Sequence, residues 1–199
     1  MMVKTLYLPG AVGNAQFWHP VAERLGGDYE LISWPGLGEE PACEHINSID
    51  DLVDMVCEKI SEPVNLVAQS MGGYVAIKTA LRHSDKIQKL VLTVASGGVE
   101  VADLGGSNWR GDYREAFPKA ARWIEEPTLD LSDAIRQLTI PALLIWGDQD
   151  PISPVAVGER LNKLLPNSHL EIIAGGDHDL AKFHDKTVAA LIKDHLNKT

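Results

Sequence analysis

Several features that direct a chain to other protein classes are scarce or missing here. The sequence has 18 Lys and Arg against 28 Asp and Glu, a net charge of −10, and no basic run. Proteins that bind nucleic acid or an anionic membrane surface rely on positive charge, so we expect neither partner. No apolar run approaches the ~18 residues of a membrane-spanning helix, and the apolar stretch near the N-terminus is too short for a signal peptide. We therefore expect a soluble, cytoplasmic protein.

Cysteine is also scarce. Cys43 and Cys57 are the only two cysteines, and they do not form a CxxC pair. Two thiols in a chain of 199 residues are typical of a cytosolic protein whose cysteines stay reduced, so the sequence favours no structural disulfide. At this length roughly 70% of the surface of the unfolded chain can be buried, so a core forms without cross-links. We expect a single domain over residues 1–199.

Short apolar runs alternate with amphipathic ones along the chain. The apolar runs are rich in Leu, Ile and Val and are bounded by Gly or Pro, which predicts buried strands. Apolar residues at helical spacing predict helices between them, one of which Ser48 caps and another of which follows Ser70. This alternation predicts an α/β fold with a mostly parallel six-stranded sheet and helices on both faces. The predicted strands are residues 6–8, 29–33, 64–68, 87–94, 140–146 and 170–174, and the predicted helices besides the one after Ser70 are residues 18–25, 49–60, 154–165 and 186–196.

One serine stands between the end of a predicted strand and the start of a predicted helix. In the run Ala68-Gln69-Ser70-Met71-Gly72, small residues lie two positions on either side of Ser70. Small neighbours let strand and helix approach closely, which places the hydroxyl above the carboxyl edge of the sheet. The pattern is G-x-S-x-G with Ala68 in place of the first glycine. The alternative is that Ser70 only caps the following helix, because serine is a common N-cap residue.

Acidic residues and a histidine follow two later strands. Asp148 and Asp150 come after the fifth predicted strand, and His178 follows the sixth. Because ligands of open α/β sheets bind at the carboxyl edge, we expect these side chains near Ser70. A serine hydroxyl needs a general base, and the imidazole needs a carboxylate to orient it. Either aspartate fits that role, or serves only as a turn residue. The remaining histidines lack this placement and are expected at the surface: His19, His45, His83, His169, His184 and His195.

Together these motifs resemble the α/β-hydrolase family over nearly the whole chain. The order serine, acid, histidine, each after a predicted strand, is the order of that family. In the family the acid stands in a Gly-x-x-Asp-x-x-x-Pro pattern, which Gly147, Asp150 and Pro154 match. The resemblance therefore implies Asp150 rather than Asp148 as the acid. The implied catalytic triad is Ser70, Asp150 and His178.

The resemblance also implies an oxyanion hole. The family builds it from the backbone N–H of the residue after the nucleophile and from an N–H in the loop after the first strand, which here are those of Met71 and Ala11. Each such N–H group contributes about 3 kcal/mol in other enzymes. Pro9 stands where relatives commonly have histidine. The alternative is that Pro9 and Gly10 only form a turn by which the chain leaves the strand.

Residues 97–131 interrupt the alternation of strands and helices. Many members of the family insert a multi-helix cap at this place, so the resemblance implies a short lid. Aromatic side chains of the lid and of the region after the first strand are expected to line the substrate site. Trp123 is expected only to anchor the lid. The predicted substrate-binding residues are Phe17, Trp18, Trp109, Tyr113 and Phe117.

The activity that follows is hydrolysis of a small carboxylic ester or thioester through an acyl-enzyme intermediate. Members of the family use the same machinery on lactones, amides and carbon–carbon bonds and for elimination, so these reactions stay open. A non-catalytic binding or scaffold protein with this fold is the alternative from another class. No cofactor and no metal are expected, because no G-x-G-x-x-G, P-loop or common zinc pattern is present. A small-molecule substrate is the expected partner.

Overall fold

Six strands form one sheet in the computed structural model, which describes residues 3–96 and 98–198. The strand order is β2-β1-β3-β4-β5-β6, and every pair of neighbours is parallel. The predicted α/β fold is confirmed, and each predicted strand lies within two residues of an observed one at either end. The strands are β1 (Lys4–Leu8), β2 (Tyr29–Leu31), β3 (Val64–Gln69), β4 (Ile87–Thr93), β5 (Ala142–Gly147) and β6 (Ser168–Ile173).

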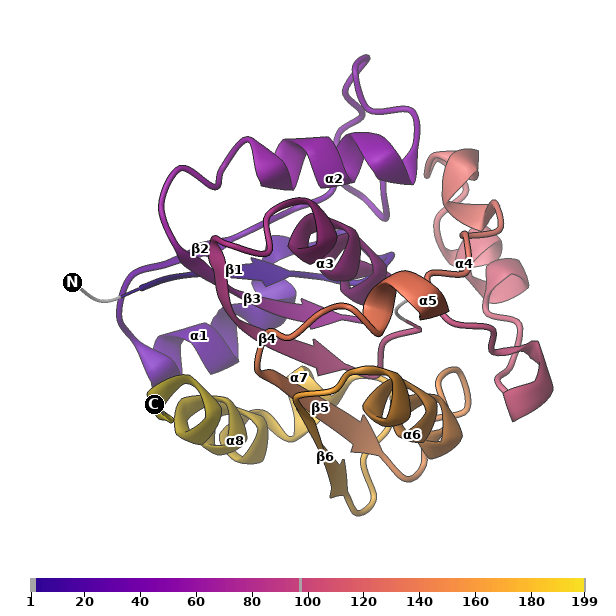
Figure 1. Cartoon of the computed structure of the whole chain (residues 1–199). Helices are drawn as coiled ribbons and strands as arrows, with labels where there is room; N and C mark the ends of the chain where they lie inside the picture. Colours follow the sequence, from indigo (N-terminus) through magenta and orange to yellow (C-terminus); the bar gives the residue numbers. More distant parts are fainter. Residues whose placement is uncertain (1–2, 97, 199) are drawn as a thin grey trace.

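The longer helices cover both faces of the sheet (Figure 1). Helices α1 (His19–Leu25) and α8 (Asp185–Asn197) pack together on one face. Helices α2 (Ile49–Cys57), α3 (Met71–Arg82) and α6 (Val155–Leu164) cover the other face. Ser48 caps α2 as predicted, because its hydroxyl accepts a hydrogen bond from the Asp51 N–H.

Six short elements were not predicted, because none of them shows a recurring apolar pattern in its sequence. Three are single turns of 3-10 helix, named η. In chain order, the six elements are η1 (Ala15–Trp18), η2 (Ala102–Leu104), α4 (Arg110–Ala116), η3 (Arg122–Glu125), α5 (Ser132–Ile135) and α7 (Leu180–Phe183).

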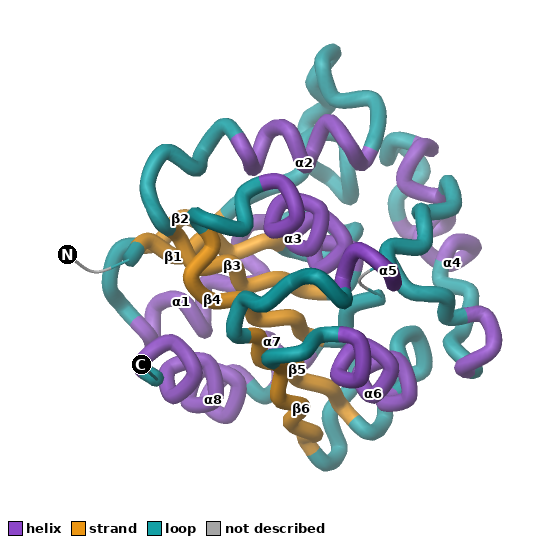
Figure 2. Tube along the Cα trace, in the orientation of Figure 1, coloured by secondary structure: helices purple, strands orange, loops and turns teal. Residues whose placement is uncertain are grey.

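The strand register brings the carboxyl ends of the strands to one edge of the sheet. Leu8 at the end of β1 pairs with Ala68, and Gly147 at the end of β5 pairs with Ile173. Residues 98–131 lie beyond this edge, where the strand arrows point (Figure 1), and consist of short helices joined by loops (Figure 2). Residues 1–2, 97 and 199 lie outside the described residues, so the first position of the predicted insertion is among them.

Two fully buried tryptophans lie beneath the loop that follows β1. The indole N–H of Trp18 donates to the Leu8 carbonyl oxygen at 2.9 Å, and that of Trp34 donates to the Pro9 carbonyl oxygen at 2.8 Å. These bonds satisfy polar groups at the end of β1 that are out of reach of water. The prediction that Trp18 binds substrate is therefore wrong, because η1 turns its ring into the core.

Two other expectations concern thiols and membranes. Cys43 and Cys57 both carry free thiols within the described structure, in agreement with the expectation of no disulfide. In the described part of the chain, no helix combines the length and the apolar character needed to cross a membrane.

His195 departs from its predicted surface position. It lies on α8, which packs against β4 and β5, and only 8% of the residue is exposed. Its Nε2 atom has no hydrogen-bond partner among the described residues. Burial, together with the positive charges of Lys89 and Lys198, lowers the pKa of His195 to about 4. The remaining five histidines outside the site are exposed or half-buried: His19, His45, His83, His169 and His184.

The buried His195 is expected to make the fold less stable in mild acid. In the unfolded chain the imidazole titrates near its ordinary value of 6.5, whereas in the folded chain its pKa is about 4. Between these values only the unfolded state binds the proton, so stability falls as the pH is lowered through this window. From pH 7 to pH 4.5 the free energy of unfolding should fall by about 2 kcal/mol more in the wild type than in His195→Gln. Urea unfolding at the two pH values measures this, and an equal pH dependence in both proteins would contradict it.

Candidate active site

Ser70 occupies a strained turn between β3 and α3. Its backbone has φ 52° and ψ −124°, a region that residues with a side chain rarely adopt. Its N–H donates to the carbonyl oxygen of Thr93 at the end of β4, at 3.0 Å. Within the described chain its side chain makes no capping hydrogen bond to α3, so the interpretation of Ser70 as a helix cap alone is wrong.

Two glycines allow this turn to pack against its neighbours. A Cβ atom on Gly72 would collide with the carbonyl oxygens of Leu8 and Pro9, and one on Gly73 would collide with the side chain of Ala95. The first turn of α3 therefore rests directly on the loop after β1 and on the end of β4. This close approach explains why the position two residues after Ser70 is glycine.

Side chains from three strand ends form one hydrogen-bonded series. Ser70 Oγ lies 2.9 Å from His178 Nε2, and His178 Nδ1 lies 2.7 Å from Asp150 Oδ2. The side chain of Asp150 is fully buried, and its Oδ1 accepts the N–H groups of Ile152 at 2.8 Å and Ser153 at 3.0 Å. Because an ionised carboxylate only accepts hydrogen bonds, Nδ1 carries the imidazole proton and Nε2 accepts from the serine hydroxyl.

Asp148 lies in a different environment. It is exposed, and its Oδ1 accepts the N–H of Gly175 at 2.7 Å and the side-chain amide of Gln149 at 3.2 Å. Asp148 therefore ties the loop after β5 to the loop after β6. The contacts of the two aspartates favour Asp150 as the partner of His178.

Gln69 is a site residue that the sequence analysis missed. It is buried at the end of β3, directly before Ser70, and its Nε2 donates to the backbone carbonyl oxygen of His178 at 3.2 Å. Its Oε1 lies so close to Gly10 that a Cβ atom there would collide with it. This hydrogen bond therefore holds in place the loop after β6, which carries His178. The signal that points to it is an amide side chain at the last position of a buried strand, next to the serine.

The two backbone N–H groups implied for the oxyanion hole are available. Among residues 3–96 and 98–198, neither the Ala11 N–H nor the Met71 N–H donates to a protein acceptor. Met71 is the first residue of α3, where a helix leaves its N–H groups without an intrahelical partner. Ala11 lies in a turn closed by the hydrogen bond from the Gly13 N–H to the Gly10 carbonyl oxygen, at 3.0 Å. Unpaired N–H groups near a nucleophile are what an oxyanion hole requires.

Aromatic side chains form a row along α4 and at its two ends. The ring of Tyr113 packs edge-on against Trp109, with centroids 5.4 Å apart, and tilted against Phe117, with centroids 5.0 Å apart. Tyr113 is 7% exposed, and its hydroxyl donates to the Ala11 carbonyl oxygen at 2.7 Å and accepts the Gly38 N–H at 2.9 Å. Its polar group is fully used inside the protein. The prediction that Tyr113 contacts substrate is therefore corrected.

The other predicted aromatic residues are partly accessible. Trp109 and Phe117 are half-buried, as is Phe17, which packs edge-on against Trp18 with centroids 5.4 Å apart. Trp123 is half-buried and, together with Tyr74 and the first residues of α2, lines a groove beside η3. Within the described ranges no group of three or more His, Cys, Asp or Glu side chains is arranged to hold a metal ion.

A serine hydroxyl, an imidazole and a buried carboxylate in this order, at the carboxyl edge of a parallel sheet, define the class of the serine hydrolases. The chain belongs to the alpha/beta hydrolase family, whose model matches residues 6–191. The predicted family, fold class and assignment as a hydrolase are thereby confirmed.

Curated relatives include two kinds of hydrolase. The chain is 25% identical over 241 residues to the pimeloyl-[acyl-carrier protein] methyl ester esterase of Neisseria meningitidis serogroup C, an alignment that covers 98% of this chain and 94% of the relative. It is 24% identical to the 2-hydroxy-6-oxononadienedioate/2-hydroxy-6-oxononatrienedioate hydrolase of Cupriavidus pinatubonensis, with 94% of this chain and 83% of the relative covered. The alignment with the esterase is longer than this chain, so that relative carries segments without a counterpart here.

Solved structures share the fold. A thermophilic esterase from Thermogutta terrifontis superposes with a TM-score of 0.80 at 18% identity, covering 98% of this chain and 89% of that one. A meta-cleavage product hydrolase from Pseudomonas fluorescens superposes with a TM-score of 0.75 at 21% identity, covering 98% and 90%.

Proposed function

We propose that the protein hydrolyses a small carboxylic ester or thioester through an acyl-enzyme intermediate on Ser70. The observation that carries this proposal is the unbroken series of hydrogen bonds from Ser70 Oγ through His178 to Asp150, at 2.9 and 2.7 Å. A hydroxyl in contact with a general base, itself oriented by a buried carboxylate, is an activated nucleophile.

In the acylation half of the reaction, Ser70 Oγ attacks the substrate carbonyl carbon while His178 Nε2 takes the hydroxyl proton. The carbonyl oxygen becomes an anion, which the N–H groups of Ala11 and Met71 stabilise. The imidazolium then gives its proton to the leaving alkoxide or thiolate, the bond from the carbonyl carbon to this group breaks, and an ester to Ser70 remains. Asp150 stabilises the positive imidazole throughout.

In the deacylation half, water takes the place of the leaving group. His178 Nε2 removes a proton from the water molecule, whose oxygen attacks the acyl carbon of the Ser70 ester. The same two N–H groups stabilise the second oxyanion. When the bond to Ser70 Oγ breaks, the imidazolium returns the proton to this oxygen, and the carboxylic acid product leaves.

We assign the recognition of substrate to the segment beyond the sheet edge. Residues 98–131 form a short lid in this proposal, and the half-buried rings of Trp109 and Phe117 supply apolar surface, together with Phe17 of η1. Apolar side chains with few convergent polar groups suit a small acyl or alkyl group. The partner is then a small molecule.

Carbon–carbon bond hydrolysis is the second candidate. The relative from Cupriavidus pinatubonensis and the structure from Pseudomonas fluorescens carry names of such hydrolases, and both match over most of this chain. The same nucleophile, base and oxyanion hole serve other bond cleavages on this fold, so the fold does not separate the two reactions.

A covalent probe and a substrate panel test the proposal together. The wild-type protein is incubated with a fluorophosphonate, and the site of the adduct is mapped by peptide mass spectrometry. The protein is then assayed on aryl esters with acyl chains of two to twelve carbons, on alkyl thioesters and on a vinylogous 1,5-diketone. We expect one adduct, on Ser70, and turnover of the short esters. Turnover of the diketone alone would favour carbon–carbon hydrolysis. A protein that forms no adduct and turns over nothing would be a binding or scaffold protein.

A further inference from the structure

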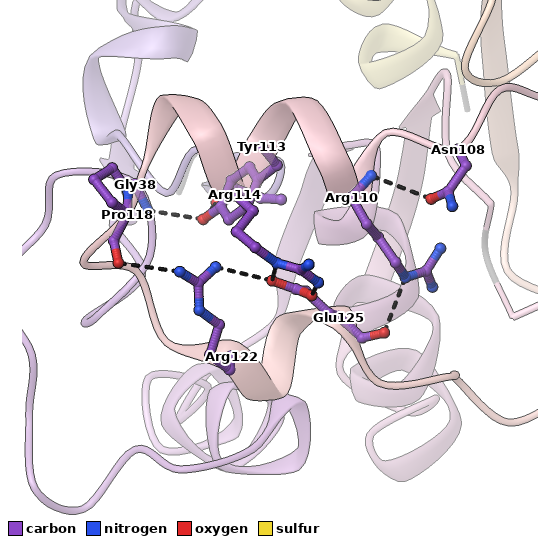
Figure 3. A network of polar contacts seen from close by, with 9 residues as sticks. Gly38, Asn108, Arg110, Tyr113, Arg114, Pro118, Arg122 and Glu125 are labelled. Carbon is purple, nitrogen blue, oxygen red and sulfur yellow. Dashed lines mark hydrogen bonds and ion pairs between the residues drawn. The ribbon is translucent and has the colours of Figure 1, made fainter.

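The hydroxyl of Tyr113 joins the lid to the loop that carries one oxyanion-hole donor. Tyr113 lies on α4, 102 positions along the chain from Ala11, and donates to the Ala11 carbonyl oxygen at 2.7 Å. The same hydroxyl accepts the Gly38 N–H at 2.9 Å, as Figure 3 shows. One buried oxygen therefore bridges three segments: the lid, the loop after β1 and the loop after β2.

Hydrogen bonds on both sides of Ala11 control the direction of its N–H. This N–H shares a peptide plane with the Gly10 carbonyl, which accepts the Gly13 N–H at 3.0 Å. The next peptide plane begins with the Ala11 carbonyl, which Tyr113 holds. With both flanking planes fixed, the two backbone dihedrals of Ala11 are fixed as well. Tyr113 supplies the second of these restraints.

The loop after β2 supports the same arrangement. The Trp34 N–H donates to the Gly13 carbonyl oxygen at 2.9 Å. Gly38 has a φ of 56° and lies so close to Val12 that a Cβ atom would collide with its carbonyl oxygen. The loop after β2 therefore packs along the loop after β1 without space between them. Tyr113 closes the contact from the lid side.

Helix α4 is itself held firmly, so Tyr113 is a fixed support. Glu125 in η3 forms ion pairs with Arg114 and Arg122, and its backbone carbonyl oxygen accepts the Nε–H of Arg110 at 2.9 Å (Figure 3). A second link joins the lid to the loop after β2, because the Ala121 N–H donates to the Gly36 carbonyl oxygen at 2.8 Å. Burial raises the pKa of the Tyr113 phenol, so the hydroxyl remains a donor at neutral pH.

We propose that Tyr113 is a positioning residue for ester hydrolysis: it orients the Ala11 N–H toward the oxyanion and makes this orientation depend on a docked lid. The inference rests on the proposed function, because it assigns Ala11 to the oxyanion hole. A donor stabilises the transition state only when it points at the oxygen as charge develops. Loosening Ala11 should therefore slow the chemical step and leave ground-state binding nearly unchanged.

The test is Tyr113→Phe, which removes the hydroxyl and keeps the ring that packs against Trp109 and Phe117. We expect kcat on a short aryl ester to fall about 10- to 50-fold, less than the 10²- to 10³-fold loss from deleting a donor outright, with KM within threefold. The affinity for an alkyl boronic acid, which places an anionic oxygen in the hole, should fall by a similar factor to kcat. If Tyr113 only stabilised the lid, its substitution would not lower kcat and the affinity for the boronic acid by the same factor while KM stays nearly constant.

Tyr29→Phe is the matched control, since it removes a tyrosine hydroxyl from the first residue of β2, at the amino end of the strands and away from Ala11. It should keep kcat within twofold, and both variants should melt cooperatively. Tyr113→Phe with wild-type kcat, with a raised KM at unchanged kcat, or with the same loss as Tyr29→Phe would overturn the inference while leaving the proposed function in place. A wild type inert to esters and fluorophosphonate would overturn both.

Discussion

Ser70→Ala is expected to lower kcat for ester hydrolysis by about a millionfold, the loss found when the serine of such a triad is removed. Without Oγ, no covalent intermediate forms, and His178 has no hydroxyl proton to take. Stopped-flow and long-time assays with a chromogenic ester measure the loss. The fluorophosphonate adduct should disappear in the same variant.

Ser48→Ala provides the contrast for this prediction. Ser48 caps α2 by accepting the Asp51 N–H at 3.2 Å, so its loss should cost about 1 kcal/mol of unfolding free energy and leave kcat unchanged. Ser70→Ala should instead abolish most of kcat and leave the free energy of unfolding nearly unchanged. Ser70→Gly should in addition be more stable than Ser70→Ala by about 1 kcal/mol, because glycine adopts a φ of 52° without strain. A Ser70→Ala protein with more than a hundredth of wild-type kcat would contradict the role of Ser70.

Asp150→Asn is expected to lower kcat by about 10⁴-fold, and Asp148→Asn by less than threefold. The substitution at Asp150 retains the size of the side chain, but an amide no longer forces the imidazole proton onto Nδ1. Nε2 then carries the proton and cannot accept one from Ser70. The Asp148 carboxylate accepts hydrogen bonds from the loop groups of Gly175 and Gln149, so its change should affect the stability of the loop.

Steady-state kinetics of the two variants, together with their urea unfolding, show which aspartate acts in catalysis. Both proteins should fold, because each substitution keeps the side-chain volume. A large loss of kcat in Asp148→Asn alone would show that the acid stands two positions earlier than we assign it. A loss below tenfold in Asp150→Asn would show that orientation by this carboxylate contributes little.

Much of the fold could be predicted from the sequence. Strands such as β3 and β5 are largely apolar runs whose every residue is buried, and a run of this kind shows in the sequence itself. The segment 98–131 gave no such signal, because its helices are too short to repeat an apolar pattern. Its internal structure depends on contacts such as the Glu125 ion pairs, which join residues on separate turns of chain.

The candidate site divides in the same way. Ser70, His178 and the two aspartates could be found because each follows a strand, and strand ends share one edge of the sheet. Trp18 and Tyr113 could not be assigned, because an aromatic residue in a loop has the same sequence pattern whether its ring faces the core or a substrate. The hydrogen bonds from the Trp18 N–H to the Leu8 carbonyl and from the Tyr113 O–H to the Ala11 carbonyl show that both rings face the protein interior.

The sequence by itself determined the parallel sheet, its helices and the set of strand ends that carry reactive side chains, because apolar periodicity is a property of residues close in sequence. Only the tertiary structure decided that Trp18 and His195 are buried and that the hydroxyl of Tyr113 restrains Ala11. These features depend on the distance and direction between polar atoms far apart along the chain, which hydrogen bonding and desolvation select only once the segments have packed.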